Sequence, residues 1–297
     1  MHILITGGAG FIGTNLTEYL LSAKHQVTIV DNLIAGKRER VSPEATFFNI
    51  DVNDTTALAE CLNGVDAVVH LAALPSVPGS IADPQTYHQV NVDGTLSVLE
   101  AARSRNVKRL LFASSSAVYG TQDTLPHKPS MEARLETPYA FHKYTSERML
   151  RLWSNLYGMK TTSLRFFNVY GPHFDPEGPY AAVIGKLLLL EKQKQPLTVT
   201  GDGEQTRDFI YVTDVVRAME AALTNPSLGR GEVLNVGTGT ETTVNTIAKS
   251  IGGEISYLPA RNELYRSVAD ITETQKLLDW QPTVTIEQGL KELQRLM

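Results

Sequence analysis

The first half of the chain alternates short apolar runs with longer amphipathic stretches, and this alternation limits the possible folds more than any other feature. Strand-like runs rich in β-branched residues occupy residues 2–7, 26–31, 45–50, 66–73 and 109–115. Most of the spacers between them are long enough to hold a helix. Parallel strands need such crossover connections, which are right-handed in nearly all cases and cover both faces of the sheet with helices. The sequence therefore predicts a doubly wound α/β domain with a parallel sheet.

The second half of the chain follows a different pattern. After residue 167 it has loops rich in glycine and proline, mixed with single helices and short strands. We therefore expect residues 1–167 to form the doubly wound domain and residues 168–297 to form mostly a smaller, mixed α/β lobe. A pattern typical of a buried strand at residues 232–237 predicts that the chain re-enters the first domain around residues 211–237.

Composition excludes several classes of function. The net charge is -5, and no basic block offsets it, which argues against a nucleic-acid partner. The single cysteine, Cys61, excludes an internal disulfide and a cysteine-based metal cluster, and we expect no metal site. Charged residues end the longest apolar run, around residues 186–190, well short of a membrane span. We expect a soluble, cytoplasmic protein without a membrane partner.

Three glycines, Gly7, Gly10 and Gly13, stand between the first strand-like run and the helix expected after it. Such a turn brings backbone N–H groups and a helix N-terminus to a pyrophosphate that side chains would block, although it can also be purely structural. Asp31 ends the second strand, eighteen residues after Gly13, where a carboxylate can accept both ribose hydroxyls of NAD and repel the 2′-phosphate of NADP. The sequence therefore predicts a Rossmann domain that binds NAD.

Three further residues modify this prediction. Lys37 and Arg38 are close enough to Asp31 in sequence to weaken its preference for NAD over NADP. Asp51 follows the third strand-like run and has two equally weighted interpretations, an adenine contact or the N-cap of the next helix.

Tyr139 and Lys143 stand four residues apart, one turn of a helix, and so share a face. This spacing alone occurs by chance in many helices. Upstream, however, a buried strand ends in the serine cluster Ser114, Ser115 and Ser116. The carboxyl edge of a doubly wound sheet is where such folds hold their ligands. Together the two features indicate a catalytic site.

A series of motifs carries a resemblance to a known family. The segments "TGGAGFIG", "VDNL", "VVHLAA", "NVDGT", "SSSAVYG", "PYAFHK", "LRFFNVYGP" and "GDGEQTRDFIYVTDVV" occur in the order of the extended short-chain dehydrogenases/reductases. Within that family the chain resembles the nucleotide-sugar 4-epimerases. The resemblance implies that Tyr139 is the acid/base, that Lys143 holds the nicotinamide ribose and that Ser115 hydrogen-bonds the reacting sugar hydroxyl.

The resemblance also implies a set of cofactor and substrate contacts. For NAD they are Gly7, Gly10, Phe11, Ile12, Gly13, Asp31, Asn32, Leu33, Gly36, Asp51, Val52, Leu71, Ala72, Ala73, Asn91, Tyr139, Lys143 and Phe167. For a UDP-sugar they are Ser76, Val77, Ser115, Ser116, Asn168, Val183, Leu197, Thr198, Val199, Arg207, Arg261, Glu263 and Ser267.

Arginines suit the pyrophosphate of that substrate, because a guanidinium donates two parallel hydrogen bonds. The resemblance implies that Arg207 and Arg261 approach it and that residues 197–200 flank the uracil. A surface ion pair with Asp208 is the alternative for Arg207. The segment "RNELYR", which contains Arg261 and Glu263, has one residue fewer than the usual pattern.

The residues after Ser115 separate possible reactions. The 4,6-dehydratases carry Asp-Glu before "VYG" and the sugar-acid decarboxylases carry a glutamate, whereas this chain has Ser116 and Ala117. Without an acid to protonate a leaving hydroxyl, reversible oxidation at C4 is favoured over elimination. Tyr139 must then titrate near pH 7 rather than about 10, a change of roughly 4 kcal/mol. An ammonium at about 4 Å supplies a similar amount, so we expect Lys143 to be sufficient.

The width of the substrate site depends on a small residue. Ser267 stands three residues before Asp270, where the resemblance implies that a small side chain admits a 2-acetamido group. Gly79 departs from the pattern, because an arginine is common there in the 2-acetamido-tolerant branch. We expect interconversion of UDP-GlcNAc and UDP-GalNAc, with UDP-glucose and UDP-galactose as further substrates. The alternatives are a reductase of a nucleotide-linked keto sugar and a non-catalytic NAD-sensing regulator, which the intact Ser115, Tyr139 and Lys143 disfavour.

Two segments suggest an assembly. Residues 86–104 and 144–158 place apolar residues, including Met149 and Trp153, at helical spacing, and we expect these to be exposed. Similar proteins pair these two helices across a twofold axis into a four-helix bundle, which implies a homodimer. The alternative is that both apolar stripes face their own sheet.

Overall fold

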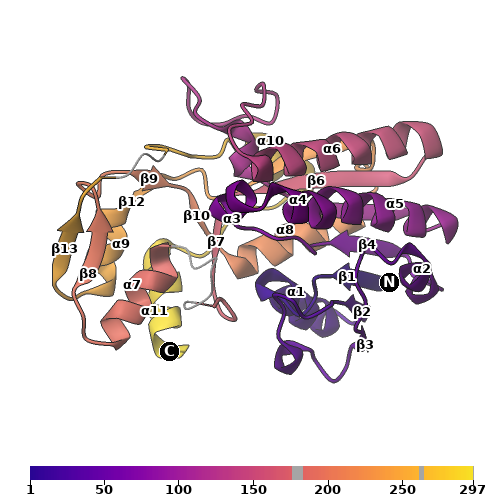
Figure 1. The fold of residues 1–297 in the computed structure, drawn as a ribbon, viewed down its shortest axis with the longest axis horizontal. Coiled ribbons are helices and arrows are strands. Elements are labelled where there is room, and N and C mark those ends of the chain that lie inside the picture. Colours follow the sequence, from indigo (N-terminus) through magenta and orange to yellow (C-terminus); the bar gives the residue numbers. More distant parts are fainter. Residues whose placement is uncertain (176–182, 261–263, 297) are drawn as a thin grey trace.

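The computed structural model describes residues 1–175, 183–260 and 264–296, and the expected parallel sheet lies at its centre (Figure 1). In this part of the chain, the sheet has seven strands in the order β11-β6-β5-β4-β1-β2-β3. Every pairing is parallel. The strands are β1 (His2–Thr6), β2 (Gln26–Val30), β3 (Thr46–Phe48), β4 (Ala67–His70), β5 (Arg109–Ser115), β6 (Lys160–Phe166) and β11 (Glu232–Val236). The predicted doubly wound fold is confirmed.

Helices cover both faces of this sheet (Figure 1). On one face α1 (Phe11–Ser22) and α8 (Val212–Thr224) share an apolar cluster with Ile3 and Ile5. On the other face α2 (Thr55–Cys61), α5 (Gly94–Ser104) and α6 (Pro138–Tyr157) share a cluster with Leu4. Successive side chains of a strand point to opposite faces, so Leu4 and its two neighbours enter different cores. This double coverage explains the nearly continuous apolar runs of the central strands.

The chain returns to the sheet late in the sequence. After β7 (Asn168–Tyr170) and β10 (Phe209–Tyr211), which pair with each other, it forms α8 and then β11. β11 lies parallel to β6, with Leu234 opposite Leu164. The late segment therefore forms one edge of the sheet.

A smaller lobe lies beside the sheet, on the left in Figure 1. It has its own apolar core, which includes Ile184, Leu188, Ile247 and Leu293. Two short strand pairs stiffen it, one parallel (β8 with β13) and one antiparallel (β9 with β12). The elements are α7 (Val183–Lys192), β8 (Leu197–Thr200), β9 (Thr206–Arg207), β12 (Thr242–Thr243), α9 (Val244–Ile251), β13 (Ile255–Leu258) and α11 (Ile286–Leu296).

The remaining elements are short and lie in the connections between the strands and helices already named. They are α3 (Val77–Ala82), α4 (Pro84–His88), a π-helical turn (Gln89–Asp93), α10 (Thr272–Leu278) and two 3₁₀ turns (Arg38–Arg40 and Ser116–Tyr119). None of the described helices has the length and apolar character needed to cross a bilayer.

The exposed apolar residues of α6 differ from those expected. The prediction that Met149 and Trp153 are exposed is wrong, because both are partly buried against the core under α5 and α6. The Trp153 indole also donates to Glu100 Oε1 at 2.9 Å. Leu152 and Leu156 are exposed instead, at 47% and 63%. They lie on the side of α6 that is turned away from its own sheet.

Candidate active site

The glycine turn between β1 and α1 permits a close backbone approach. Gly7 has a φ of +71°, and a Cβ there would lie 2.7 Å from the Ala72 backbone nitrogen. A Cβ on Gly13 would lie 2.3 Å from the Gly7 carbonyl oxygen. Gly10 caps α1 without a side-chain hydrogen bond, so the N-terminal amides of this helix are not covered by a capping side chain. Uncovered amides at a helix N-terminus suit a phosphate group.

Asp31 is placed at the end of β2, beside this turn. Its side chain is buried, with Oδ2 accepting from the Ala9 N–H at 3.0 Å and Oδ1 from the Leu33 N–H at 2.8 Å. Burial raises the pKa of Asp31, and these two hydrogen bonds oppose the rise. A Cβ on Gly36 would lie 2.7 Å from Asp31 Oδ1, so only glycine lets the loop pass this close to the carboxylate.

Asp51 is not a helix cap. Asp54 caps α2 instead, by accepting from the Ala57 N–H. Asp51 accepts from the Asn32 side chain at 2.8 Å and from the Asn53 backbone at 2.8 Å. Partial burial would raise its pKa, but these hydrogen bonds outweigh burial and lower the pKa of Asp51. The capping interpretation is therefore wrong. The carboxylate lies after β3, at the carboxyl edge of the sheet.

Lys37 and Arg38 both have partners other than Asp31. Lys37 Nζ lies 3.1 Å from Asp175 Oδ2, and the Arg38 guanidinium lies 4.5 Å from the centroid of the Phe47 ring. These contacts tie Lys37 to the segment after β7 and Arg38 to β3.

The other predicted cofactor contacts sit on loops and helix starts at the same carboxyl edge. Asn91 fixes the loop after β4, since its side chain exchanges two hydrogen bonds with the Leu74 backbone at 2.8 and 3.0 Å. Phe167 follows β6 and is buried against Tyr119. The set at this edge also includes Phe11, Ile12, Leu33, Val52, Leu71 and Ala73.

Tyr139 stands in the first turn of α6, close to the helix cap. Thr137 caps this helix by accepting from the Ala140 N–H, and Pro138 holds its first position. The Tyr139 N–H donates to Ser80 Oγ on α3 at 3.1 Å. Ser80 was not found from the sequence, because a serine in a short helix carries no signal of a contact 59 residues away. α3 thus fixes the start of the helix that carries the tyrosine.

Lys143 lies one turn further along α6 and is buried. Its Nζ donates to the Ala113 carbonyl of β5 at 2.7 Å and lies 5.9 Å from the centroid of the Tyr139 ring. Burial lowers the pKa of Lys143 to about 8, and the Glu147 carboxylate opposes this change. Tyr139 and Lys143 therefore meet at the end of β5, as their spacing predicted.

The titration expected of Tyr139 is not supplied by Lys143 alone. Burial raises the pKa of Tyr139 to about 12, and a hydrogen bond with the Ser115 side chain opposes the rise. The expectation that the ammonium suffices is wrong, because Lys143 lies over the ring and is bonded to a carbonyl. Any further lowering of this pKa needs another positive charge in the site.

Ser115 ends β5 and caps the 3₁₀ turn after it. Its Oγ accepts from the Ala117 N–H at 3.2 Å. This turn, Ser116–Tyr119, carries no acid. Ser115 therefore lies beside Tyr139 without a carboxyl group on the adjoining turn.

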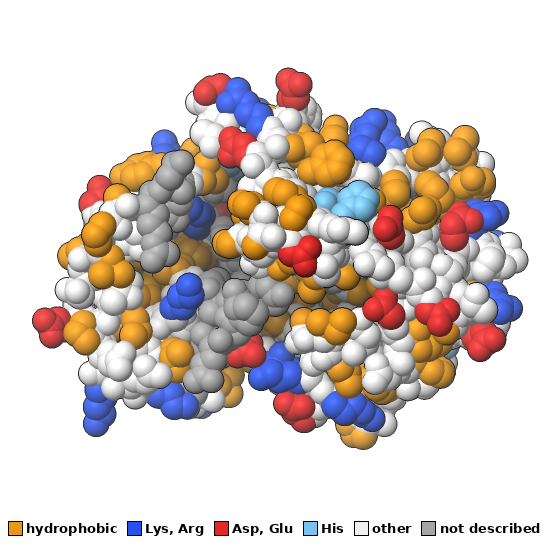
Figure 2. Space-filling view, in the orientation of Figure 1, with side chains coloured by type: hydrophobic (Ala, Val, Ile, Leu, Met, Phe, Trp, Pro, Cys, Tyr) orange, Lys and Arg blue, Asp and Glu red, His pale blue; other side chains and the backbone are white. Residues whose placement is uncertain are grey.

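The predicted substrate residues come from several segments. Ser76 caps α3, and Val77 begins it. Asn168 Nδ2 donates to the Asp208 carbonyl at 3.0 Å, and Val183 begins α7. These residues border the sheet domain and the smaller lobe, and Figure 2 shows the surface hollowed between these two parts.

On β8 the side chains alternate. Leu197 and Val199 are fully buried in the core of the lobe, whereas Thr198 is exposed. A nucleotide base at this strand could therefore touch its backbone and Thr198, but not the two apolar side chains.

Arg207 lies on β9, where its Nη1 donates to the Thr206 carbonyl at 2.8 Å and the Tyr265 carbonyl at 3.4 Å. The carboxylate of Asp208 is turned inward, where it accepts from the backbone N–H groups of Thr238, Gly239 and Ala269. The buried Asp208 carboxylate thus joins two loops through hydrogen bonds to their backbones and is not the surface ion-pair partner of Arg207.

Of the predicted site residues near the C-terminus, the structure describes only Ser267. Arg261 and Glu263 lie outside the described residues. Ser267 is 4% exposed and precedes α10, which begins at Thr272, so it does not start that helix. Gly79 on α3 also has a reason to be glycine, because a Cβ there would lie 2.1 Å from the Tyr87 hydroxyl.

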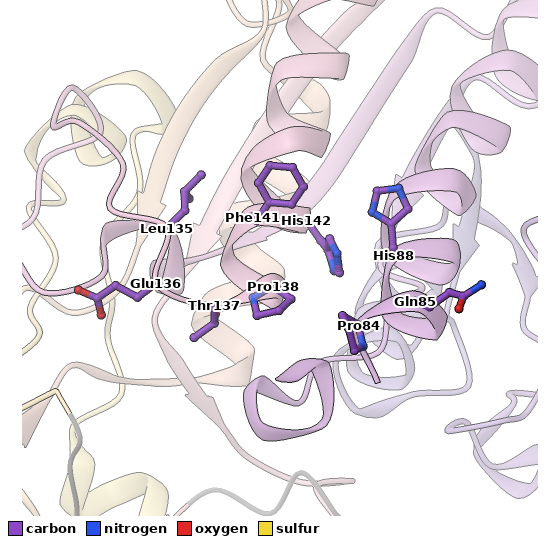
Figure 3. Close-up of a pocket in the computed structure, with 9 residues that line it drawn as sticks. All are labelled: Pro84, Gln85, His88, Leu135, Glu136, Thr137, Pro138, Phe141 and His142. Atoms are coloured by element: carbon purple, nitrogen blue, oxygen red, sulfur yellow. The ribbon is translucent and has the colours of Figure 1, made fainter. Parts of the chain in front are cut away.

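A hollow of about 700 Å³ lies on the outer side of this region, between α4 and the start of α6 (Figure 3). The rings of His88 and His142 meet there edge to face, 5.2 Å apart. The hollow is lined by Pro84, Gln85, His88, Leu135, Glu136, Thr137, Pro138, Phe141 and His142. None of these belongs to the predicted catalytic or cofactor set.

The geometry agrees with comparisons to known proteins. Residues 3–237 match the model of the NAD dependent epimerase/dehydratase family. The chain belongs to this family. It is 37% identical to a putative UDP-glucose 4-epimerase of Methanocaldococcus jannaschii, over 98% of this chain and 96% of the relative. As in other family members, NAD is the cofactor, and the glycine turn, the uncovered amides of α1 and Asp31 are suited to hold it.

Two solved epimerases share the fold closely. The UDP-glucose 4-epimerase of Thermotoga maritima, with UDP-glucose, has a TM-score of 0.93 and 36% identity over 98% of this chain and 96% of the other. The UDP-N-acetylglucosamine 4-epimerase of Methanobrevibacter ruminantium M1, in complex with UDP-N-acetylmuramic acid, has a TM-score of 0.93 and 34% identity over 100% and 99%. These two relatives differ in the sugar that they are named for.

Proposed function

We propose that this family member is an NAD-dependent 4-epimerase of UDP-hexoses that works through a transient 4-keto sugar. The observation that carries the proposal is the meeting of Ser115, Tyr139 and Lys143 at the end of β5, beside a turn without an acid. An oxidation at C4 needs a base and a positive charge there, whereas elimination needs an additional acid.

Each of the three residues has a distinct task in this reaction. Tyr139 accepts the proton of the C4 hydroxyl and later returns it. Ser115 hydrogen-bonds the same hydroxyl and keeps it directed at the tyrosine. NAD⁺, when bound, would supply the hydride acceptor and a positive charge beside Tyr139 in addition to that of Lys143. Lys143 would hold the nicotinamide ribose.

We propose that the smaller lobe grips the nucleotide. In this division residues 1–167 hold NAD, and residues 168–297 hold mostly the UDP-sugar. Arg207 at the lobe edge suits the pyrophosphate because its fork can donate two hydrogen bonds. Arg261 and Glu263 complete the proposed set, together with the backbone of β8.

We propose UDP-GlcNAc and UDP-GalNAc as the preferred pair, with UDP-glucose and UDP-galactose also accepted. The support is Ser267, whose small side chain is buried in the loop before α10. The named function of the Methanobrevibacter relative is consistent with this preference.

A panel of nucleotide sugars tests the proposal. The purified protein, supplied with NAD, is incubated separately with UDP-GlcNAc, UDP-glucose and dTDP- and GDP-hexoses, and the C4 epimers are resolved by chromatography. We expect epimerisation of the UDP-hexoses without net change in NADH absorbance. A parallel incubation supplies NADH and a nucleotide-linked 4-keto sugar, and net consumption of NADH there without epimerisation of any UDP-hexose would show a reductase instead. Bound NAD without turnover of any sugar would show a non-catalytic protein.

A further inference from the structure

A third charged residue lies on the catalytic face of α6, one turn beyond Lys143. Glu147 is 3% exposed, and the spacing of four residues places it on the face that carries Tyr139 and Lys143. The four-residue spacing of Tyr139 and Lys143, continued for one more turn, leads to Glu147 and is the signal in the sequence that indicates it. A buried carboxylate needs partners, and its partners show what it connects.

Glu147 bonds two neighbouring strands at one register position. Ser114 on β5 lies opposite Arg165 on β6 in the parallel pairing. Ser114 Oγ donates to Glu147 Oε1 at 2.5 Å. Arg165 donates from Nε to Oε1 and from Nη2 to Oε2, both at 2.8 Å. The carboxylate therefore joins α6, β5 and β6 at a single point.

That point is adjacent to the catalytic groups. Ser114 immediately precedes Ser115, and the Ala113 carbonyl before it accepts from Lys143 Nζ. The same three-residue stretch of β5 thus holds the lysine, the carboxylate and the catalytic serine. A shift of α6 relative to β5 would move Tyr139 and Ser115 apart.

Stability alone is a poor explanation for this ion pair. A buried salt bridge is often no more stabilising than an apolar pair of the same volume, because both charges lose their hydration. Arg165 Nη1 also has no hydrogen-bond partner among the described residues, so hydrogen bonds do not fully replace the hydration that the ion pair loses on burial. Its guanidinium lies 4.8 Å from the centroid of the Tyr119 ring, which offsets part of the cost.

We propose that Glu147, held by Arg165 and Ser114, is a positioning residue that aligns α6 with β5 and so keeps Lys143 at the Ala113 carbonyl. This inference rests on the proposed function, because it assigns a role within the same site. Glu147 acts through Lys143 and Ser115 and does not itself touch the substrate.

The charged and titratable groups around Lys143 determine in which direction its pKa changes when Glu147 is replaced. Tyr139 and Glu147 lie on α6, His70 on β4 and Arg165 on β6. Burial lowers the pKa of His70 to about 3, so this ring stays neutral and adds no charge. Burial lowers the pKa of Lys143, and Glu147 is the group that opposes this change. Removing the negative charge should lower that pKa further.

Glu147→Gln tests the charge at nearly constant shape. Lys143 is titrated by NMR in protein labelled with ¹³C-lysine, and its signal is assigned with Lys143→Met. We expect its pKa to fall by about one unit, in line with loss of an opposite charge nearby. The alkaline limb of the turnover profile should move down by the same amount, which is about a fivefold loss at pH 8 for a group that starts near that pH.

A second variant covers the case in which Glu147→Gln fails to fold. Glu147→Gln with Arg165→Met removes both charges and leaves neither ion unpaired. We expect it to fold and to lose turnover, while the pKa of Lys143 falls less than in Glu147→Gln because the Arg165 cation is also removed. A wild-type titration and full turnover in this double variant would overturn the inference.

Asp214→Asn is the matched control. Asp214 is also a fully buried carboxylate with an arginine partner, Arg217, but it lies on α8 at the opposite face of the sheet. It should disturb stability without moving the Lys143 titration. The titration needs no substrate, so a shift in Glu147→Gln without sugar turnover by the wild type would overturn only the proposed function. Turnover by the wild type with an unmoved titration would overturn only the positioning role.

Discussion

Tyr139 combines deep burial with a hydroxyl that gives up its proton in the proposed reaction. Its ring is buried, and its pKa of about 12 shows that the surrounding protein favours the neutral phenol. Ser115 and the fixed start of α6 keep the hydroxyl in place. The hydroxyl is therefore held in position, whereas in the proposed reaction the lowering of its pKa depends on the positive charge of NAD⁺.

Tyr139→Phe should abolish epimerisation and leave NAD bound. The change removes the proton acceptor and keeps the ring in its buried place. We expect a loss of at least about 100-fold in turnover, the usual contribution of an acid/base group. Turnover is measured by resolving C4 epimers, and cofactor content by the absorbance of NAD released on denaturation. A variant that keeps more than a hundredth of the wild-type rate would contradict the role of Tyr139.

Ser267→Tyr should change the choice of sugar. If Ser267 borders the C2 substituent, a ring in its place clashes with an acetamido group and spares UDP-glucose. Overpacking costs about 1–3 kcal/mol, which is roughly a 5- to 150-fold change in the ratio of the two kcat/KM values. Ser267→Ala keeps the space and should leave the ratio unchanged. Equal losses on both sugars, together with a lower Tm, would show that Ser267 serves only packing.

At the scale of elements, α5 and α6 present an unpartnered surface. Leu96 on α5 and Phe141, Leu152 and Leu156 on α6 are all at least 40% exposed. Figure 2 shows apolar side chains gathered over these helices at its upper right. We propose that this surface forms the four-helix bundle of a homodimer.

Leu156→Glu should break that dimer. Light scattering of the wild type at micromolar concentration should give twice the 32.6 kDa of the chain. A charge on the apolar face that the bundle would bury should return the variant to the monomer mass. Leu296→Glu is a matched control, because Leu296 is also 63% exposed but lies on α11 in the smaller lobe. A wild-type protein of monomer mass would rule out the dimer.

At the scale of the whole molecule, His127 links segments that are far apart. Its ring stacks on Tyr119 with centroids 4.7 Å apart, and neither ring nitrogen has a hydrogen-bond partner among the described residues. Its backbone bonds to Val268 and Asp270 of the loop before α10. Burial lowers its pKa from 6.5 to about 4. The folded protein therefore keeps this histidine neutral where the unfolded chain would protonate it.

His127→Phe should flatten the pH dependence of stability. Between pH 6.5 and about 4 the unfolded chain binds a proton at His127 and the folded protein does not, so stability falls as the pH falls. The phenyl ring keeps the stack and removes this loss, which is about 1–3 kcal/mol at the acid end. Thermal unfolding from pH 4 to 7.5 measures it. The two proteins should differ little at pH 7.5, and parallel curves at all pH values would contradict the assignment.

Much of the fold and the centre of the site could be predicted because they depend on local patterns. The alternation of strands and helices gave the parallel sheet, and parallel strands all end at one edge, so Gly7, Asp31 and Ser115 had to come together there. The spacing of Tyr139 and Lys143 was sufficient to predict that their side chains lie together, because residues one helical turn apart share a face of the helix. These inferences need only the geometry of a single element or of a single sheet edge.

The sequence by itself therefore determined the doubly wound sheet, the glycine turn after β1 and the residues at the end of β5. Only the tertiary structure decided which buried groups support them. Glu147 meets Ser114 across 33 residues and Arg165 across 18, and these contacts depend on the register of β5 against β6 and on how α6 lies over both strands. The exposure of Leu156 rather than Trp153 was likewise decided by packing. Burial and pKa follow from the whole set of neighbours around a side chain, which no local pattern specifies.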